Sequence, residues 1–202
     1  MTAVAALPRS AAVVSAAGVA AIGRYDDTAG RVDGAKGFRG HLGALRSGRL
    51  TSGSVKVLGI GAAGLLTAIR LGPRRPGDVL LGGAVVAGCA NLVNLLDLRP
   101  GRALKVGTAA ALALGDLGVA GSCAALLPAD LGERTMLGDA GANALGAVLG
   151  SRLAAVLPGR RARLAALGVL AGLSMASERV SFTAVIEGSP PLRWLDQLGR
   201  RP

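Results

Sequence analysis

Apolar residues occur along the chain in long runs that carry no polar stripe at helical spacing. A surface helix of a soluble domain keeps one polar face, whereas a helix that is apolar all round is buried or spans a membrane. The pattern predicts one all-α domain over residues 1–202, a transmembrane bundle of about six segments. The runs are Ser10–Gly23, Val57–Leu71, Val79–Leu96, Val106–Leu127 (broken at Asp116), Ala142–Leu157 and Leu164–Ala176.

Composition favours helices packed closely in lipid. Hydrophobic residues make up 51% of the chain, aromatic residues only 2%, and 32 of 202 residues are glycine. Small residues let helix backbones touch in lipid, and glycine-rich faces would also suit a homodimer. The high apolar content disfavours disorder. The position of Cys89 and Cys123 inside apolar runs disfavours a disulfide scaffold. The alternative is a soluble bundle rich in Gly and Ala.

The formal net charge of +11 suits nucleic acid, anionic lipid or a phosphorylated substrate. Nucleic acid is disfavoured, because the basic residues lie between apolar runs and almost no aromatic residues could stack on bases. Most Lys and Arg residues fall in alternate loops, which the positive-inside rule places on the cytoplasmic side of the membrane. These loops are 24–56, 97–105, 128–141 and 178–202.

The N-terminal residues lack the basic start and the clean cleavage site of a signal peptide. Pro8 and Arg9 also interrupt the first apolar stretch. We expect the first segment to be a retained helix.

A glycine pattern in the second run resembles a dinucleotide-binding fingerprint. Gly59, Gly61 and Gly64 form G-x-G-x-x-G, and Asp78 follows at roughly the distance of a ribose-binding acid. However, Asp78 precedes an apolar run instead of ending a second strand, and no alternation of strands and helices follows. We therefore interpret the run as a glycine-rich membrane helix.

The first polar motif is Tyr25-Asp26-Asp27. Adjacent carboxylates at a helix end suit Mg²⁺, which prefers oxygen ligands. Consecutive helical residues point about 100° apart, so only one of the pair can touch a given ion. The alternative is a helix cap with a solvated acid.

The second motif contains Asn91, Asn94 and Asp97, which are spaced three apart and share a helix face. They could bind a phosphate, a sugar or the waters of a metal ion, or they could form hydrogen bonds between helices. The basic residues that follow could meet phosphate oxygens. They are Arg99, Arg102 and Lys105.

The third motif runs from Met136 to Asn143 and surrounds Asp139 with small residues. Asp139 is expected near the N-terminus of the next helix, where backbone amides favour anions; the alternative is a plain N-cap. Together the three motifs place acids, amides and bases at one membrane face. This combination suits phosphoryl transfer, in which the protein positions groups and neutralises charge.

The order YDD, KGFRGHLGAL, NLVNLLD and MLGDAGANALG resembles the polyprenyl-phosphate N-acetylhexosamine-1-phosphate transferases, which include phospho-N-acetylmuramoyl-pentapeptide transferase. The resemblance runs from about Ser10 to Arg179. It implies a multi-helix enzyme of the bacterial cytoplasmic membrane that moves a sugar-1-phosphate from a UDP-sugar to a polyprenyl phosphate. UMP would be released, with Mg²⁺ or Mn²⁺ as cofactor. Lys36 resembles a loop lysine that contacts phosphate.

Further residues carry over from the family motifs. Asp26 and Asp27 match an Asp pair that works near the lipid phosphate and the metal. Asn94 and Asp97 match the N-x-x-D stretch at the nucleotide and metal, and Asp139 matches a Mg²⁺ ligand of the G-D-x-G motif. The resemblance implies that the lipid phosphate attacks the β-phosphate of the UDP-sugar in line, with Asp26 or Asp27 orienting or deprotonating it.

The chain departs from the family pattern at several positions. Gly30 replaces a Lys that follows the Asp pair, and Pro100 replaces a second Asp after N-x-x-D. A late His-rich loop is missing, since His41 is the only histidine. The chain is also shorter than a typical member, and the resemblance implies that one or more N-terminal helices are absent. These departures leave open a non-catalytic protein of the same fold that binds lipid-linked precursors or envelope-synthesis partners.

Overall fold

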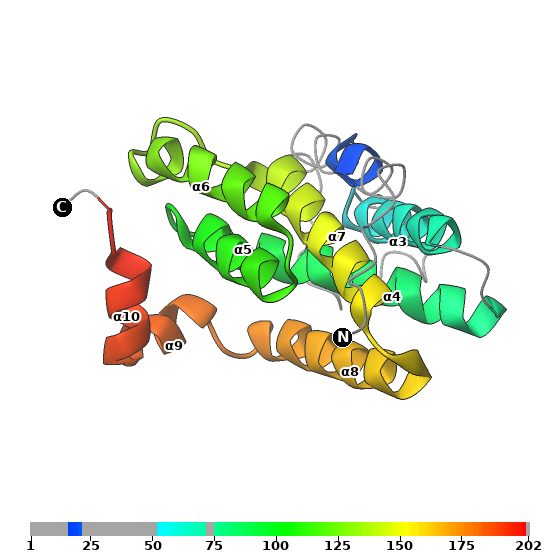
Figure 1. Ribbon diagram of the computed structural model, residues 1–202. Helices are drawn as coiled ribbons and strands as arrows, with labels where there is room; N and C mark the ends of the chain where they lie inside the picture. Colours follow the sequence, from blue (N-terminus) through cyan, green and yellow to red (C-terminus); the bar gives the residue numbers. More distant parts are fainter. Residues whose placement is uncertain (1–15, 22–51, 72–74, 201–202) are drawn as a thin grey trace.

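The computed structural model describes residues 16–21, 52–71 and 75–200, and every regular element within them is a helix (Figure 1). The fold is therefore all-α, as predicted. Residues 16–21 are helical. The helices that follow are α3 (Ser52–Arg70), α4 (Pro76–Leu96), α5 (Arg102–Ala113), α6 (Leu117–Leu131), α7 (Gly138–Val156), α8 (Gly159–Ser177), α9 (Phe182–Gly188) and α10 (Pro190–Gln197).

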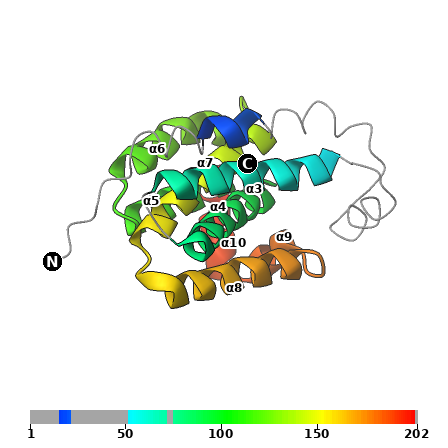
Figure 2. The same cartoon turned by 90° about the vertical axis from the view of Figure 1, so that its right-hand side faces the viewer.

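Helix α4 lies in the middle of the bundle and packs against α3, α7 and α8. Figure 2 shows α8 on one side of α4, with α3 and α7 on the other. The α5–α6 hairpin covers α7, and the segment 16–21 lies beside α3, where Val19 joins a buried cluster with Ile60 and Ala63.

Glycines set the distance between the central helices. A Cβ on Gly64 of α3 would lie 2.6 Å from the carbonyl oxygen of Gly83, and one on Gly150 of α7 would lie 2.8 Å from the Cα of Val86. A Cβ on Gly146 would overlap the backbone of Cys89 and Ala90. The backbones of α3, α4 and α7 can approach this closely because these positions have no side chain.

Six apolar runs were expected to form helices, and the five runs within 52–200 do so. The run broken at Asp116 forms two helices, and the Asp116 side chain accepts a hydrogen bond from the Val119 amide as the N-cap of α6. The first run, Ser10–Gly23, is described only at 16–21.

Membrane-spanning length is met by fewer helices than expected. Among the described residues, only Pro76–Leu96 is long and apolar enough to cross a membrane by itself. Gly159–Ser177 and Phe182–Gly188 pass the same test only as a pair that bends by 91°, and Leu58–Arg70 and Leu117–Leu131 are apolar but shorter. One such helix supports membrane association only weakly, because the central helix of a soluble bundle can be equally apolar.

The glycines of the dinucleotide-like pattern lie inside a helix. Gly59, Gly61 and Gly64 fall within α3, and Asp78 lies in the first turn of α4. A dinucleotide fingerprint needs these glycines in the turn between a strand and a helix. The helical interpretation of this run is confirmed.

Candidate functional site

Two of the polar motifs meet where the end of α4 faces the start of α7. Asp97 is the C-cap of α4, and its carboxylate accepts a hydrogen bond from the Gly138 amide at the start of α7. Burial raises the pKa of Asp97 to about 6; the charges of Asp130 and Asp139 add to the rise, and the Gly138 hydrogen bond opposes it. Three carboxylates from three helices therefore share one region of negative potential.

Asn143 links the two motifs from inside the bundle. Its Nδ2 donates to the carbonyl oxygen of Asp139 at 2.6 Å and to Oδ1 of Asn94 at 3.3 Å. The residue is fully buried, and its Oδ1 has no hydrogen-bond partner. A buried amide oxygen without a partner costs free energy, so Asn143 is held here at a cost while it fixes the amide of Asn94.

Asp139 does not cap its helix. The N-cap of α7 is Leu137, which makes no side-chain cap hydrogen bond, and Asp139 lies in the first turn. The N-cap alternative is therefore wrong. A carboxylate in the first turn is favoured by the helix dipole, and the backbone amides there remain suited to an anion.

Asn91 does not face the same neighbour as Asn94. Its Nδ2 donates to Oγ of Ser174 on α8 at 2.9 Å, whereas Asn94 meets Asn143 on α7. Residues three apart on a helix differ by about 60° in direction, and this difference is enough to direct the two amides to different helices. Hydrogen bonding between helices thus accounts for the observed contact of Asn91, and its role in binding substrate stays a prediction.

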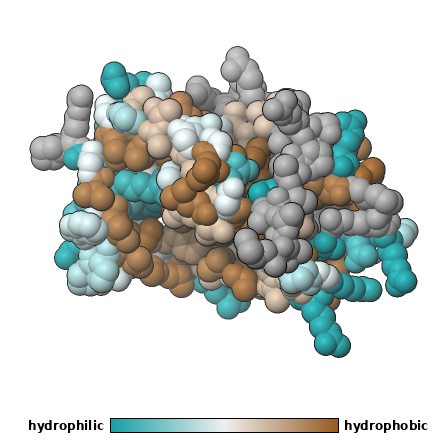
Figure 3. Space-filling view, in the orientation of Figure 1, coloured by the Kyte–Doolittle hydropathy of each residue, from teal (hydrophilic) through white to brown (hydrophobic). Residues whose placement is uncertain are grey.

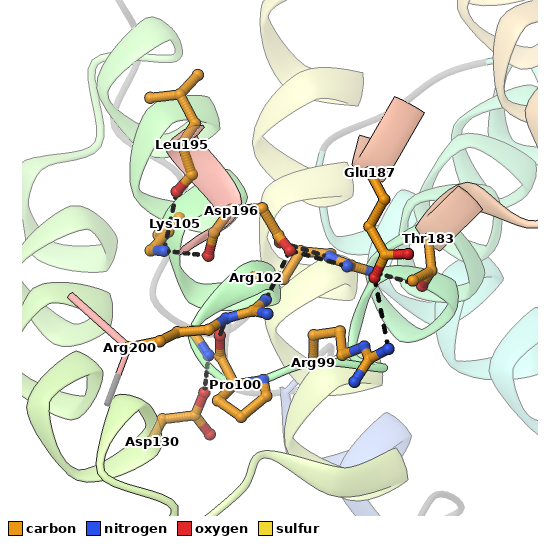
Figure 4. Close-up of polar contacts among 11 residues, drawn as sticks. Arg99, Pro100, Arg102, Lys105, Asp130, Thr183, Glu187, Leu195, Asp196 and Arg200 are labelled. Carbon is orange, nitrogen blue, oxygen red and sulfur yellow. Dashed lines mark hydrogen bonds and ion pairs between the residues drawn. The ribbon is translucent and has the colours of Figure 1, made fainter. Parts of the chain in front are cut away.

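Arg102, at the start of α5, forms a buried ion pair with the C-terminal helix α10 (Figure 4). Its Nε and Nη2 donate to Oδ1 and Oδ2 of Asp196 at 2.7 and 3.0 Å, and its Nη1 donates to Oγ1 of Thr183 at 2.9 Å. Only 3% of Arg102 is exposed. The guanidinium that was expected to meet phosphate therefore already has a bidentate carboxylate partner.

Lys105 and Arg99 also contact the C-terminal segment. The Lys105 ammonium donates to the carbonyl oxygens of Leu195 and Asp196 at 2.9 and 2.8 Å, in the last turn of α10, where such carbonyls lack helical partners. Arg99 pairs with Glu187 at 3.5 Å in an exposed contact. Phosphate binding by the three basic residues stays a prediction, and Arg99 is the one whose contact is most open to solvent.

Two acidic residues of this region were not singled out as site residues in the sequence. Asp130, buried in the last turn of α6, accepts the Gly101 amide at 2.6 Å. Gly101 has a φ of 74°, and a Cβ there would contact Leu131. Asp196 accepts from Arg200 as well as Arg102. Asp130 carried one sequence signal, because it is an acidic residue in a loop expected on the same side as Asp97 and Asp139.

The other predicted site residues lie outside the described part of the chain. Asp26 and Asp27, the acidic pair, and Lys36, the loop lysine, all fall within residues 22–51. Their catalytic and phosphate-binding roles stay predictions.

The carboxylates suit a hard cation by their chemistry. Among the described residues, no group of three His, Cys, Asp or Glu side chains is arranged to hold a metal ion. Mg²⁺, however, is commonly bound through one or two carboxylates with waters completing its shell. Asp97 and Asp139 supply two such groups, and their mutual repulsion would be relieved by a cation. The oxygen ligands present therefore fit Mg²⁺ or Mn²⁺.

Comparisons with known proteins found no match: no protein-family model matches the chain, and no curated protein and no solved structure is significantly similar to it.

Proposed function

We propose that the protein is a polytopic membrane transferase that moves a sugar-1-phosphate from a UDP-sugar to a polyprenyl phosphate at the cytoplasmic face of a bacterial membrane. The observation that carries the proposal is that the charges of Asp97, at the end of α4, and Asp139, at the start of α7, interact, while Asn143 of α7 joins Asn94 to the carbonyl oxygen of Asp139. These residues come from the two best-described motifs of the resemblance and are more than 40 residues apart in the sequence.

Large apolar side chains on the outside of the bundle support the membrane location. Leu66 and Ile69 on α3, Leu80 on α4 and Val169 on α8 are each more than half exposed. The buried core, in contrast, is mostly Ala, Gly and Val. Figure 3 shows brown, hydrophobic residues over much of the middle of one face. A bundle with small residues inside and large apolar residues outside is typical of helices packed in lipid, which favours a membrane location.

The proposed reaction is an in-line displacement at phosphorus. An oxygen of the lipid phosphate bonds to the β-phosphorus of the UDP-sugar, and the bond from that phosphorus to UMP breaks. Asn94 accepts a hydrogen bond from Asn143 and would donate its own amide hydrogens to a phosphate or sugar oxygen, and the first-turn amides of α7 would favour the anionic substrate. Asp26 or Asp27 would orient or deprotonate the lipid phosphate.

Asp97 and Asp139 are the residues that would hold Mg²⁺, which, when bound, neutralises charge on the pyrophosphate. Without a cation, the negative charges of Asp97 and Asp139 would repel the anionic UDP-sugar. Binding of the UDP-sugar should therefore depend on the cation.

A second candidate is a non-catalytic protein of the same fold that binds lipid-linked precursors. It is favoured by the C-terminal segment, which occupies the side chains of Arg102 and Lys105 with Asp196 and nearby carbonyls. Pro100 stands where the family that the chain resembles has an Asp. Its carbonyl oxygen accepts a hydrogen bond from Arg200, so this loop helps to hold the C-terminal segment.

Purified protein in detergent, incubated with Mg²⁺, a polyprenyl phosphate and a panel of labelled UDP-sugars, tests the proposal. We expect UMP release that is lost in Asp139→Asn and kept in Asp116→Asn. Asp116 is a matched control because it lies at the other end of the bundle and Asn is an equally good N-cap. Absence of turnover with every sugar, together with retained binding of polyprenyl phosphate, would support the second candidate instead.

A further inference from the structure

Helix α10 turns its one acidic residue inward and leaves its large apolar side chains exposed. Asp196 is its one buried residue, and it pairs with Arg102. Trp194 and Leu198 are each two positions from Asp196 and so lie on the opposite side of the helix. They are 63% and 51% exposed, and Leu195 beside them is also half exposed. A helix on a water-soluble domain would have the reverse orientation.

Helix α9 continues this outward apolar surface. It has no buried residue, and Val185 is half exposed. The α9–α10 segment is therefore held to the bundle through polar contacts, namely Arg102 with Thr183 and Asp196, and Lys105 with the end of α10. Its apolar side chains are left for some other environment.

The direction of the segment indicates which environment this is. The axis of α9 is turned by 91° from that of α8, and Figure 1 shows α9 and α10 turning away at the end of α8. If α8 stands across a bilayer, α9 then runs along the surface of that bilayer. Arg179, between α8 and α9, and Arg193 on α10 are exposed, so two arginines lie beside the apolar side chains. The exposed Glu187 of α9 is paired with Arg99.

We propose that α9 and α10 lie in the headgroup layer of an anionic membrane leaflet, with Trp194, Leu195 and Leu198 facing the acyl chains and Arg179 and Arg193 reaching lipid phosphates. Trp favours this layer because its ring is apolar and its N–H is polar. Short amphipathic helices with basic residues bind such surfaces. The inference rests on the proposed membrane location, but it does not depend on the transferase activity.

Trp194 is the only tryptophan of the chain, so intrinsic fluorescence reports on this one position. The full chain is reconstituted in phosphatidylcholine–phosphatidylglycerol vesicles that contain spin-labelled lipids, with the label at the headgroup, high on the acyl chain or near its end. We expect the strongest quenching from the shallow acyl label. Quenching by aqueous iodide without quenching by any lipid would overturn the proposal, and so would protection from both, which would indicate a second copy of the chain over this face.

Charge variants test the role of anionic lipid. Arg179→Gln with Arg193→Gln should weaken docking of the segment by about fivefold for each arginine removed, seen as lost shallow quenching in vesicles with little phosphatidylglycerol. Arg160→Gln with Arg161→Gln, at the opposite end of α8, removes the same charge and should leave the quenching unchanged. Equal effects of the two pairs would contradict the proposal.

Asp139→Asn separates this inference from the proposed function. Loss of UMP release with unchanged Trp194 quenching is the expected result. If wild-type protein shows no turnover with any sugar but Trp194 is quenched at shallow depth, the interfacial segment stands and the transferase proposal fails. If UMP is released but lipid quenchers have no effect, the interfacial segment fails alone.

Discussion

The α4–α7 interface and the attachment of α10 to the bundle are stabilised by different interactions. At the α4–α7 interface, Gly146 and Gly150 let the backbones of the two helices touch. At the attachment of α10, the buried contact is the Arg102–Asp196 ion pair with its hydrogen bonds. The first depends on the absence of side chains and the second on two charges that compensate each other. Substitutions should therefore damage them in different ways.

The largest effect is expected at the α4–α7 interface. Gly146→Leu would place a side chain where the backbone of Cys89 and Ala90 lies, and we expect a loss of about 3 kcal/mol or more in the free energy of unfolding. Thermal unfolding in detergent measures this loss of stability. We also expect the displaced helices to break the hydrogen bond between Asn94 and Asn143. Wild-type stability in this variant would show that α4 and α7 are not in backbone contact.

The ion pair should respond to removal of one partner. Asp196→Ala leaves Arg102 buried without its carboxylate, at a cost of about 3 kcal/mol, and Arg102→Met with Asp196→Leu should recover most of that loss.

Burial alone would raise the pKa of Asp196, but Arg102, Arg200 and Lys105 together hold it below its ordinary value. The ion pair therefore stabilises the fold above about pH 4, and this contribution is lost as the pH falls through the lowered pKa. Limited proteolysis of the C-terminal segment at several pH values measures this contribution. Additive effects of Arg102→Met and Asp196→Leu on the free energy of unfolding would contradict the pairing.

Asp97 should show the opposite pH dependence. Its pKa is raised to about 6, so the folded protein holds its proton more tightly than the unfolded chain does. Stability from this group is present at low pH and is lost as the pH rises from about 4 to 6. Asp97→Asn should therefore stabilise the metal-free protein above pH 6, by about 1–2 kcal/mol once partial solvent screening is included. Thermal unfolding at several pH values in the presence of a chelator checks this; a variant less stable at pH 7.5 would contradict it.

The smallest effect is expected at a glycine with no close neighbour. A Cβ on Gly61 of α3 meets nothing within 4 Å, so Gly61→Ala should stabilise the helix by about 0.5–1 kcal/mol. Gly150→Ala is the matched variant, because its Cβ would lie 2.8 Å from the Cα of Val86, and it should destabilise the fold. Both are compared by thermal unfolding in detergent, and effects of the same sign would remove the distinction between open and closely packed glycines.

The helices could be predicted from the sequence because apolar runs and their breaks are local features, and the break at Asp116 marks an N-cap. The meeting of Asp97 with Asp139 followed from loops expected on the same side. The attachment of α10 could not be predicted, because the pairing of Arg102 with Asp196 joins residues 94 positions apart and has no periodic signal. The partners of Asn91 and Asn94 also escaped prediction, since a shared stripe does not say which helix each amide meets.

Binding of Mn²⁺ to purified protein, followed by electron paramagnetic resonance, tests the central claim that Asp97 and Asp139 share one cation. We expect one Mn²⁺ site in the wild-type chain, strongly weakened in both Asp97→Asn and Asp139→Asn and unchanged in Asp116→Asn. Equal Mn²⁺ binding by all three variants, or loss in only one of the first two, would contradict it.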